Sequence, residues 1–272
     1  MEEVKNFPNL LIIGAAKSGT TSLHNYLKQH PDFFMSDHKE PHFLINNEIG
    51  VKRIHKAVTT LSDYQEMFEG SSEYKYRGES SVMYLPFPDI AIRNIKKYLN
   101  KDVKIIIMLR NPTERAYSAY QHVSKGIREQ KSFEEALSIE ENRMQDDKTM
   151  TPMIMYKGMG MYYKMVKAYL DTFKNVHIIL YDDFRDNTKI EMMKVYKFLG
   201  VENDVNVNLN VKHNKSLIFI KFLDFNILPF SSIEVLLSTE SQRYKSSIAA
   251  STKLPPLNDP LVLSEATNLN LT

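Results

Sequence analysis

Residues 14–22 carry the first group of side chains whose types and spacing suggest chemistry. Gly14 and Gly19 are separated by four residues, and a lysine, Lys17, lies between them. Hydroxyl side chains surround the second glycine: Ser18, Thr20, Thr21 and Ser22. Glycines at this spacing, between a strand and a helix, form loops whose backbone N–H groups and helix N-terminus face an anion. The group therefore predicts a phosphate-binding loop.

The position of the lysine distinguishes this loop from the usual nucleotide-triphosphate loop. That loop reads G-x-x-x-x-G-K-[ST], and its lysine reaches the β- and γ-phosphates. Here Thr20 has that position, and Lys17 lies inside the loop. We expect Lys17 beside whatever is attached to the first phosphate. The alternative is a strand–helix turn with incidental glycines, which the run of hydroxyl residues after an apolar segment disfavours.

A second candidate anion site combines Arg110 with Ser118. Arg110 directly follows the apolar run 103–109, and Ser118 lies about two turns into the helix predicted after it. A guanidinium group presents a fork of donors that suits a phosphate, so we expect both side chains to converge on one anion. The alternative for Arg110 is a salt bridge at the strand end. Arg115, in the same helix, is either a further phosphate ligand or a solvent-facing arginine.

Glu40 and His42 form the candidate acid–base group. They lie in the segment Lys39-Glu40-Pro41-His42-Phe43. A hydroxyl that acts as a nucleophile must lose its proton, so a carboxylate or an imidazole within hydrogen-bond reach is required. We expect Glu40 to be the general base, with His42 assisting it or positioning the acceptor. A purely structural, buried role is the alternative for His42.

Buried strands and amphipathic helices must position these groups. Continuous apolar runs predict strands buried on both faces of a parallel sheet, at Leu10–Ile13, Val103–Leu109 and Val176–Tyr181. Helical spacing and capping residues predict helices at Thr20–His30, Pro88–Leu99, Pro112–Lys125, Met161–Phe173 and Thr188–Leu199. In such alternating folds ligands bind at the carboxyl ends of the strands. We expect an α/β fold, a P-loop-like three-layer sandwich with a central parallel sheet flanked by helices.

The bulk composition limits the class of protein. The 272 residues, 43% of them hydrophobic and 25% charged, suit one globular domain. We expect a single domain over 1–272, with a peripheral insertion at 45–76 and a C-terminal lid or tail at 217–272. The net charge of +2 argues against a nucleic-acid partner, and the lack of cysteine excludes disulfides and thiolate chemistry.

The N-terminal segment bears on the location of the protein. Residues 1–5 are acidic and run almost directly into the first predicted strand. A signal peptide would need a basic region followed by an apolar stretch, and no stretch has the length that spans a bilayer. We expect no transmembrane segment and a cytoplasmic location. The alternative is a catalytic domain separated from its membrane anchor.

The order of the three groups resembles the sulfotransferases that use 3′-phosphoadenosine 5′-phosphosulfate (PAPS), in the branch that includes the glycan sulfotransferases. The run from Lys17 to Thr21 is similar to that family's 5′-phosphosulfate loop, and the Glu40 segment to its Glu-x-His-Phe-Phe pattern. The resemblance implies that Lys17 is the catalytic lysine and Glu40 the base. It also implies that Arg110 and Ser118 bind the donor's 3′-phosphate.

Two later segments depart from the family pattern. Gly78-Glu79-Ser80-Ser81 with Tyr84 resembles a Gly-Glu-Ser/Thr-Ser/Thr-Pro-x-Tyr segment near the reaction centre, but Val82 stands at the proline position. Residues 212–216 fall where relatives place a loop over the nucleotide, without the glycine- and arginine-rich sequence often seen there. The sequence therefore does not predict how the nucleotide is covered.

The resemblance implies transfer of a sulfuryl group from PAPS to a hydroxyl of a carbohydrate or glycoconjugate, releasing adenosine 3′,5′-bisphosphate (PAP). PAPS is then the co-substrate, and no metal is required. A lipid or small hydrophobic acceptor is an alternative, because the C-terminal half is apolar and rich in methionine and tyrosine. A P-loop kinase that uses ATP and Mg²⁺ and a non-catalytic nucleotide-binding scaffold are the alternatives of other classes.

Overall fold

The computed structural model describes residues 7–50, 52–54, 56–125, 128–147, 149–202 and 207–209. All of them belong to one compact unit, Met1–Lys221. The segments predicted as a nucleotide-covering loop, 212–216, and as a C-terminal lid or tail, 217–272, lie outside the described residues. The organisation of the whole chain as a single domain stays a prediction.

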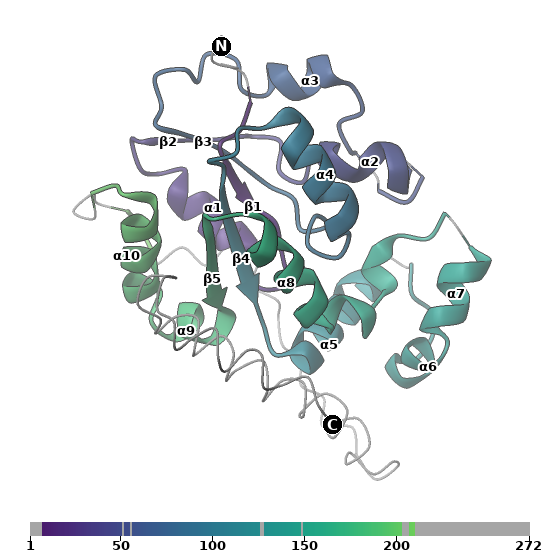
Figure 1. Ribbon diagram of the computed structural model, residues 1–272. Coiled ribbons are helices and arrows are strands. Elements are labelled where there is room, and N and C mark those ends of the chain that lie inside the picture. The colour runs from purple at the N-terminus through teal and green to yellow at the C-terminus, as the bar shows by residue number, and fades with distance from the viewer. Residues whose placement is uncertain are drawn as a thin grey trace, which may run out of the picture. The chain divides into compact units, whose positions relative to one another are not determined.

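Five parallel strands form the central sheet, in the spatial order β2-β3-β1-β4-β5. Their bounds are β1 Leu10–Ile12, β2 Phe33–Met35, β3 Tyr76–Ser80, β4 Lys104–Leu109 and β5 Val176–Leu180. The all-parallel sheet with helices on both faces confirms the predicted α/β sandwich (Figure 1). The strand order turns at β1, which pairs with β3 on one side and β4 on the other.

Alternate residues of the two central strands build the two halves of the core. Leu10 and Ile12 of β1 pack in one cluster with Ile106 and Met108 of β4, and helices α1 (Thr20–Leu27), α9 (Tyr181–Asp186) and α10 (Thr188–Leu199) complete that cluster. Leu11 is equally buried but points to the opposite face. That face carries α4 (Pro88–Tyr98) and α8 (Tyr162–Thr172) (Figure 1). Burial on both faces explains the apolar runs of β1 and β4. The prediction of a strand buried on both faces is wrong for β5, which lies at the edge of the sheet and is half-buried except at Ile179.

The helices largely follow the predicted ranges. The remaining ones are α2 Phe43–Ile49, α3 Leu61–Glu66, α5 Pro112–Lys125, α6 Phe133–Ser138 and α7 Glu140–Asp146. The Asn111 side chain accepts from the backbone N–H groups of Thr113 and Glu114, which fixes the start of α5. Helices α2, α7 and α9 were not predicted from the sequence, since each is too short to show a helical period. Of the helices described, none is long and apolar enough to cross a membrane.

The segment 45–76 contributes to the interior as well as to the surface. Tyr64 of α3 is fully buried, and its ring stacks on Phe43 with centroids 4.3 Å apart. Its hydroxyl donates to Glu79 Oε1 of β3 at 3.0 Å. The mixed composition of this segment showed no sign of that contact, because only the fold brings α3 to the end of β3.

Candidate functional site

The three predicted groups meet at one edge of the sheet. The loop 13–19 follows β1, Arg110 follows β4, and the segment 36–42 follows β2. Because all five strands are parallel, these connections leave the sheet at the same carboxyl edge. The structure therefore brings Lys17, Glu40 and Arg110 to one side of the molecule.

The loop before α1 has the geometry of an anion cradle. Gly19 has a φ of 88°, and a Cβ atom there would lie 3.2 Å from the Tyr181 ring and 3.3 Å from Met108 Cε, so only glycine fits without strain. Helix α1 begins at Thr20 and has no acidic residue in its first turn. No carboxylate within the first turn of α1 therefore neutralises the positive end of the helix dipole or competes with a ligand for the first backbone N–H groups. This loop fits a phosphate.

Left-handed backbone marks the predicted catalytic residues. Four described residues other than glycine have positive φ: Lys17 (68°), Glu40 (65°), His42 (51°) and Lys56 (62°). Three of the four are the residues that the sequence singled out for catalysis. Such conformations cost free energy and collect at functional sites, where the surrounding structure holds them in place. The backbone thus supports the site independently of the side-chain types.

Lys17 is a partly buried cation among other cations. Burial lowers the pKa of its ammonium group, and the charges of Lys125, Arg110 and Lys39 lower it further. An anion bound among these side chains would relieve both the lost hydration and the repulsion. The electrostatics of the loop therefore favour an anionic ligand.

Arg110 is tied to the loop and to a carboxylate. Its Nη1 donates to the Lys17 carbonyl oxygen at 3.4 Å, and its Nε and Nη2 donate to Glu114 Oε2 at 3.1 and 3.0 Å. The guanidinium carbon lies 4.7 Å from the centroid of the Tyr181 ring. The strand-end salt bridge weighed as an alternative thus exists. A phosphate bound at Arg110 would compete with Glu114 for its donors.

One face of α5 continues this site. Ala116, Ala119 and Val123 pack into a separate apolar cluster. The opposite face carries the polar residues of the helix at spacings of three and four, namely Glu114, Ser118, His122 and Lys125. Burial lowers the pKa of His122, and the charges of Lys17, Lys125 and Arg128 lower it further. This face is therefore directed at the loop, and Ser118 lies one turn beyond the carboxylate that holds Arg110.

Two features of α5 differ from expectation. Arg115 is fully buried, and its Nη2 donates to the carbonyl oxygen of Tyr156, so it is neither solvent-facing nor accessible to a phosphate. Lys125 and His122 were not recognised from the sequence. Their spacing from Ser118 was a usable signal, because residues four and seven positions apart share a helix face.

Glu40 is the accessible carboxylate of the acid–base group. Its Oε2 accepts from the backbone N–H of Val82 at 2.8 Å and lies 3.3 Å from His42 Nε2, while Lys39 forms an ion pair with Oε1. The Glu40 side chain is 29% exposed, whereas that of His42 is 7% exposed. Burial lowers the pKa of His42 to about 4, against the opposing effect of the Glu40 charge. His42 is thus a neutral imidazole beside a carboxylate that can accept a proton.

The departure from the family pattern at Val82 has a structural consequence. The N–H of Val82 donates to the Glu40 carboxylate. A proline at this position has no N–H and could not make that bond. In this chain the Glu40 carboxylate therefore gains a donor that the family pattern would lack.

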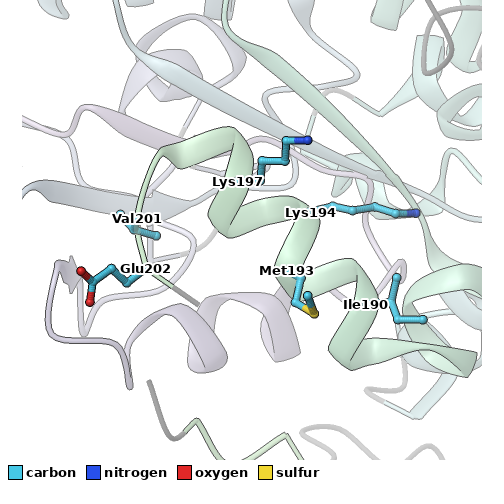
Figure 2. A pocket seen from close by; sticks show the side chains of 6 residues that line it. All are labelled: Ile190, Met193, Lys194, Lys197, Val201 and Glu202. Atoms are coloured by element: carbon cyan, nitrogen blue, oxygen red, sulfur yellow. The ribbon is translucent and has the colours of Figure 1, made fainter. Parts of the chain in front are cut away.

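A surface hollow lies away from this site. It has a volume of about 540 Å³ and is lined by α10 and the residues after it, as Figure 2 shows: Ile190, Met193, Lys194, Lys197, Val201 and Glu202. None of these residues belongs to the loop, to α5 or to the Glu40 segment. Nowhere in the described part of the chain do three or more His, Asp or Glu side chains gather as a metal site would require.

Buried neutral histidines make the stability of the fold depend on pH. Burial lowers the pKa values of His24, His42 and His177 to about 4. These groups take up protons more readily when unfolded, so stability is present above pH ~6.5 and is lost as the pH falls toward 4. Glu79, whose pKa burial raises to about 7, has the opposite sign but is a single group. We expect the free energy of unfolding to be lower at pH 5 than at pH 7 by roughly 2 kcal/mol or more.

Urea denaturation at the two pH values measures this difference. His177 stacks on Phe198 with ring centroids 5.0 Å apart, outside the candidate site. His177→Phe should therefore reduce the pH dependence without affecting the loop. Equal stability of the wild type at pH 5 and pH 7 would contradict the prediction.

The fold and the site together define a class: an α/β protein with an anion cradle after its first strand and a lysine inside that cradle. Residues 7–217 match the family model described as a sulfotransferase domain. The chain therefore belongs to the sulfotransferase domain family. This confirms the resemblance deduced from the three motifs.

Individual relatives are similar at low identity. Carbohydrate sulfotransferase 15 of Mus musculus is 25% identical over 245 residues, covering 71% of this chain and 44% of that protein. Bifunctional heparan sulfate N-deacetylase/N-sulfotransferase 1 of Homo sapiens is 28% identical over 206 residues, covering 73% of this chain and 23% of that protein. The crystal structure of a sulfotransferase from Alicyclobacillus acidocaldarius is similar with a TM-score of 0.74 at 31% identity, covering 89% of this chain and 96% of that one. The chain thus spans less than half the length of these curated relatives.

Proposed function

We propose that this chain transfers a sulfuryl group from PAPS to a hydroxyl group of a carbohydrate or glycoconjugate. The observation that carries the proposal is the position of Lys17. It lies in a left-handed conformation inside the anion cradle, bonded through its carbonyl oxygen to Arg110 and surrounded by further cations. A lysine at this place suits a group attached to the first phosphate, and does not suit the β- and γ-phosphates of ATP.

Different residues of the site bind the two phosphate groups of PAPS. Bound PAPS supplies an activated sulfuryl group whose leaving group is PAP. Arg110 and Ser118 bind the 3′-phosphate, which no ATP-like ligand carries. The backbone N–H groups at the start of α1 hold the 5′-phosphate, with hydroxyl groups added by Thr20, Thr21 and Ser22. Ser18, predicted to add a hydroxyl group, has a fully buried side chain and contributes only through the backbone of the loop.

Glu40 acts on the attacking oxygen and Lys17 on the leaving oxygen. The acceptor oxygen forms its bond to sulfur while the bond between sulfur and the phosphate oxygen breaks. Glu40 accepts the proton of the acceptor hydroxyl, and neutral His42 orients the carboxylate through Nε2. Negative charge grows on the leaving oxygen, where the ammonium of Lys17 stabilises it most in the transition state. No residue in this scheme requires a metal.

The acceptor that we propose is a carbohydrate. The names of the relatives favour a carbohydrate. Lys39 and Lys125 beside the cradle add positive charge, which suits an acceptor with carboxylate or sulfate groups. Transfer from radiolabelled PAPS to heparosan, desulfated chondroitin and a long-chain alcohol would separate a carbohydrate from a lipid acceptor. A cytoplasmic location stays a prediction.

Arg110→Ala tests the 3′-phosphate site and, with it, the donor. In thermal-shift titrations the wild type should be stabilised by PAP, by about 2.7 kcal/mol at a hundred times the dissociation constant, and little by AMP. The variant should bind PAP roughly 10- to 100-fold more weakly, because a charge-assisted hydrogen bond contributes about 1.5–3 kcal/mol. Its binding of AMP should not change.

Arg185→Ala is the matched control for this titration. Arg185 lies 5.8 Å from the centroid of the same Tyr181 ring, but it is exposed and paired with Asp182 and Asp186. It should leave the affinity for PAP unchanged. Stabilisation of the wild type by ATP with Mg²⁺ alone would favour a kinase, and no stabilisation by any nucleotide would reject a working donor site.

A further inference from the structure

A fully buried carboxyl group lies directly behind the acid–base group. Glu79 of β3 has no exposed surface and is bonded by three hydroxyl groups. Ser81 Oγ donates to its Oε2 at 2.7 Å, and Tyr84 and Tyr64 donate to its Oε1 at 2.7 and 3.0 Å. Burying a carboxyl group costs free energy unless the group is hydrogen-bonded, and here three hydroxyl groups offset that cost. The burial of Glu79 at this place therefore calls for a functional reason.

Ser81 connects this carboxyl group to the acid–base turn. Its single hydroxyl proton goes to Glu79, which leaves its lone pairs to accept from the backbone N–H of His42 at 3.0 Å. The backbone N–H of Ser81 donates to Ile12 of β1 at 3.0 Å, so its position is set by the sheet. A continuous path of hydrogen bonds thus runs from the buried carboxyl group to the backbone of His42.

The next residue along the chain completes the connection to Glu40. The Val82 N–H donates to the Glu40 carboxylate, and the Glu40 N–H donates to the Ser80 carbonyl oxygen at 2.9 Å. Both Glu40 and His42 are left-handed, a conformation that L-residues adopt only at a cost in free energy. The segment 80–82 therefore supplies the bonds that keep this turn from relaxing.

We propose that Glu79 is a positioning residue for the catalytic base: its carboxylate fixes Ser81, and Ser81 with its neighbours holds the turn that presents Glu40 to the acceptor. The proposal rests on the proposed function, in which Glu40 takes the proton. Burial raises the pKa of Glu79 to about 7, against the hydrogen bonds from Tyr84, Ser81 and Tyr64 and together with the charge of Glu40. The three hydroxyl donors oppose this rise and so favour the carboxylate, the form that accepts from Ser81.

Two single-hydroxyl deletions test the proposal. Ser81→Ala and Tyr64→Phe each remove one hydroxyl donor from Glu79, but only Ser81 also contacts the turn. With the best acceptor of the panel, Ser81→Ala should lower kcat at least tenfold while the dissociation constant of PAP stays within twofold. Tyr64→Phe should keep kcat within twofold, and Ser81→Thr, which retains a hydroxyl, should recover most of the rate. Equal losses of kcat in Ser81→Ala and Tyr64→Phe would overturn the proposal.

Glu79→Gln separates positioning from packing. The amide keeps the shape of the side chain but offers one acceptor oxygen and one N–H group in place of two acceptor oxygens, so the hydroxyl groups on both sides can no longer all donate to it. If Glu79 acts through Ser81, the double variant should be no slower than Ser81→Ala alone. Losses that multiply in the double variant would show an independent role and reject the proposal.

A measurement that needs no acceptor tests the positioning role of Glu79 even if the proposed function is wrong. The ring nitrogens of His42 can be followed by ¹⁵N NMR in the protein with PAP. Their shifts should change in Ser81→Ala and Glu79→Gln and stay as in the wild type in Tyr64→Phe. An unchanged His42 spectrum in Ser81→Ala rejects the positioning role, whereas absence of transfer by the wild type rejects only the proposed function.

Discussion

Lys17→Ala should lower kcat for sulfuryl transfer about 10³-fold, the largest effect that we expect from one substitution. A preorganised donor at a position where charge develops contributes about 10²- to 10³-fold, and an ammonium at the leaving oxygen is of this kind. Both Lys17 and its replacement carry a Cβ atom, so the left-handed backbone at φ 68° penalises them equally. The loss therefore reports the ammonium group and not a change of loop conformation.

Stability and a surface lysine provide the controls. Burial and three neighbouring cations already disfavour the charged form of Lys17, so its removal should leave the free energy of unfolding equal or higher. Lys28→Ala removes a lysine at the end of α1 that pairs with exposed Asp37, and it should change neither kcat nor stability appreciably. Retention of more than a tenth of the wild-type kcat in Lys17→Ala would contradict the mechanism.

Glu40→Gln should lower kcat about 10²- to 10³-fold without weakening the binding of PAP. General base catalysis contributes about 10²- to 10⁴-fold. The amide can keep an oxygen toward the N–H of Val82, so the turn should survive while proton acceptance is lost. Single-turnover rates with preloaded PAPS measure the chemical step directly.

Glu48→Gln is the matched control for this substitution. Glu48 lies on α2, is exposed, and pairs with Arg93 outside the site. It should leave the single-turnover rate unchanged, since an exposed ion pair contributes little. If Glu40→Gln retained the wild-type rate, the base would have to be sought elsewhere, and buried His42, with a pKa of about 4, would be the next candidate.

Much of this protein could be read from the sequence because its signals are local. Apolar runs indicated strands β1, β4 and β5, of which β1 and β4 are buried on both faces and the edge strand β5 is half-buried, and capping residues indicated the helices after them. The loop motif at Lys17, the Arg110 strand end and the Glu40 segment each depend on neighbours within a few residues. The family match over residues 7–217 confirms the sulfotransferase family that these three segments together indicated.

The tertiary structure decided the partners that lie far apart in the chain. The residues next to Arg115 in the sequence do not distinguish it from an arginine on the surface of a helix. It is nevertheless fully buried, because α5 packs the face that carries it against the residues around Tyr156. Glu79 and Tyr64 meet only because the fold places α3 beside the end of β3.

The acid–base turn shows the same division. The sequence by itself determined that Glu40 and His42 lie next to each other and carry suitable groups. Only the fold decided that the N–H of Val82, 42 positions away, holds the Glu40 carboxylate and that burial keeps His42 neutral. Residue type and spacing are properties of the chain, whereas burial and long-range hydrogen bonds arise when the strands align, and these set protonation and orientation.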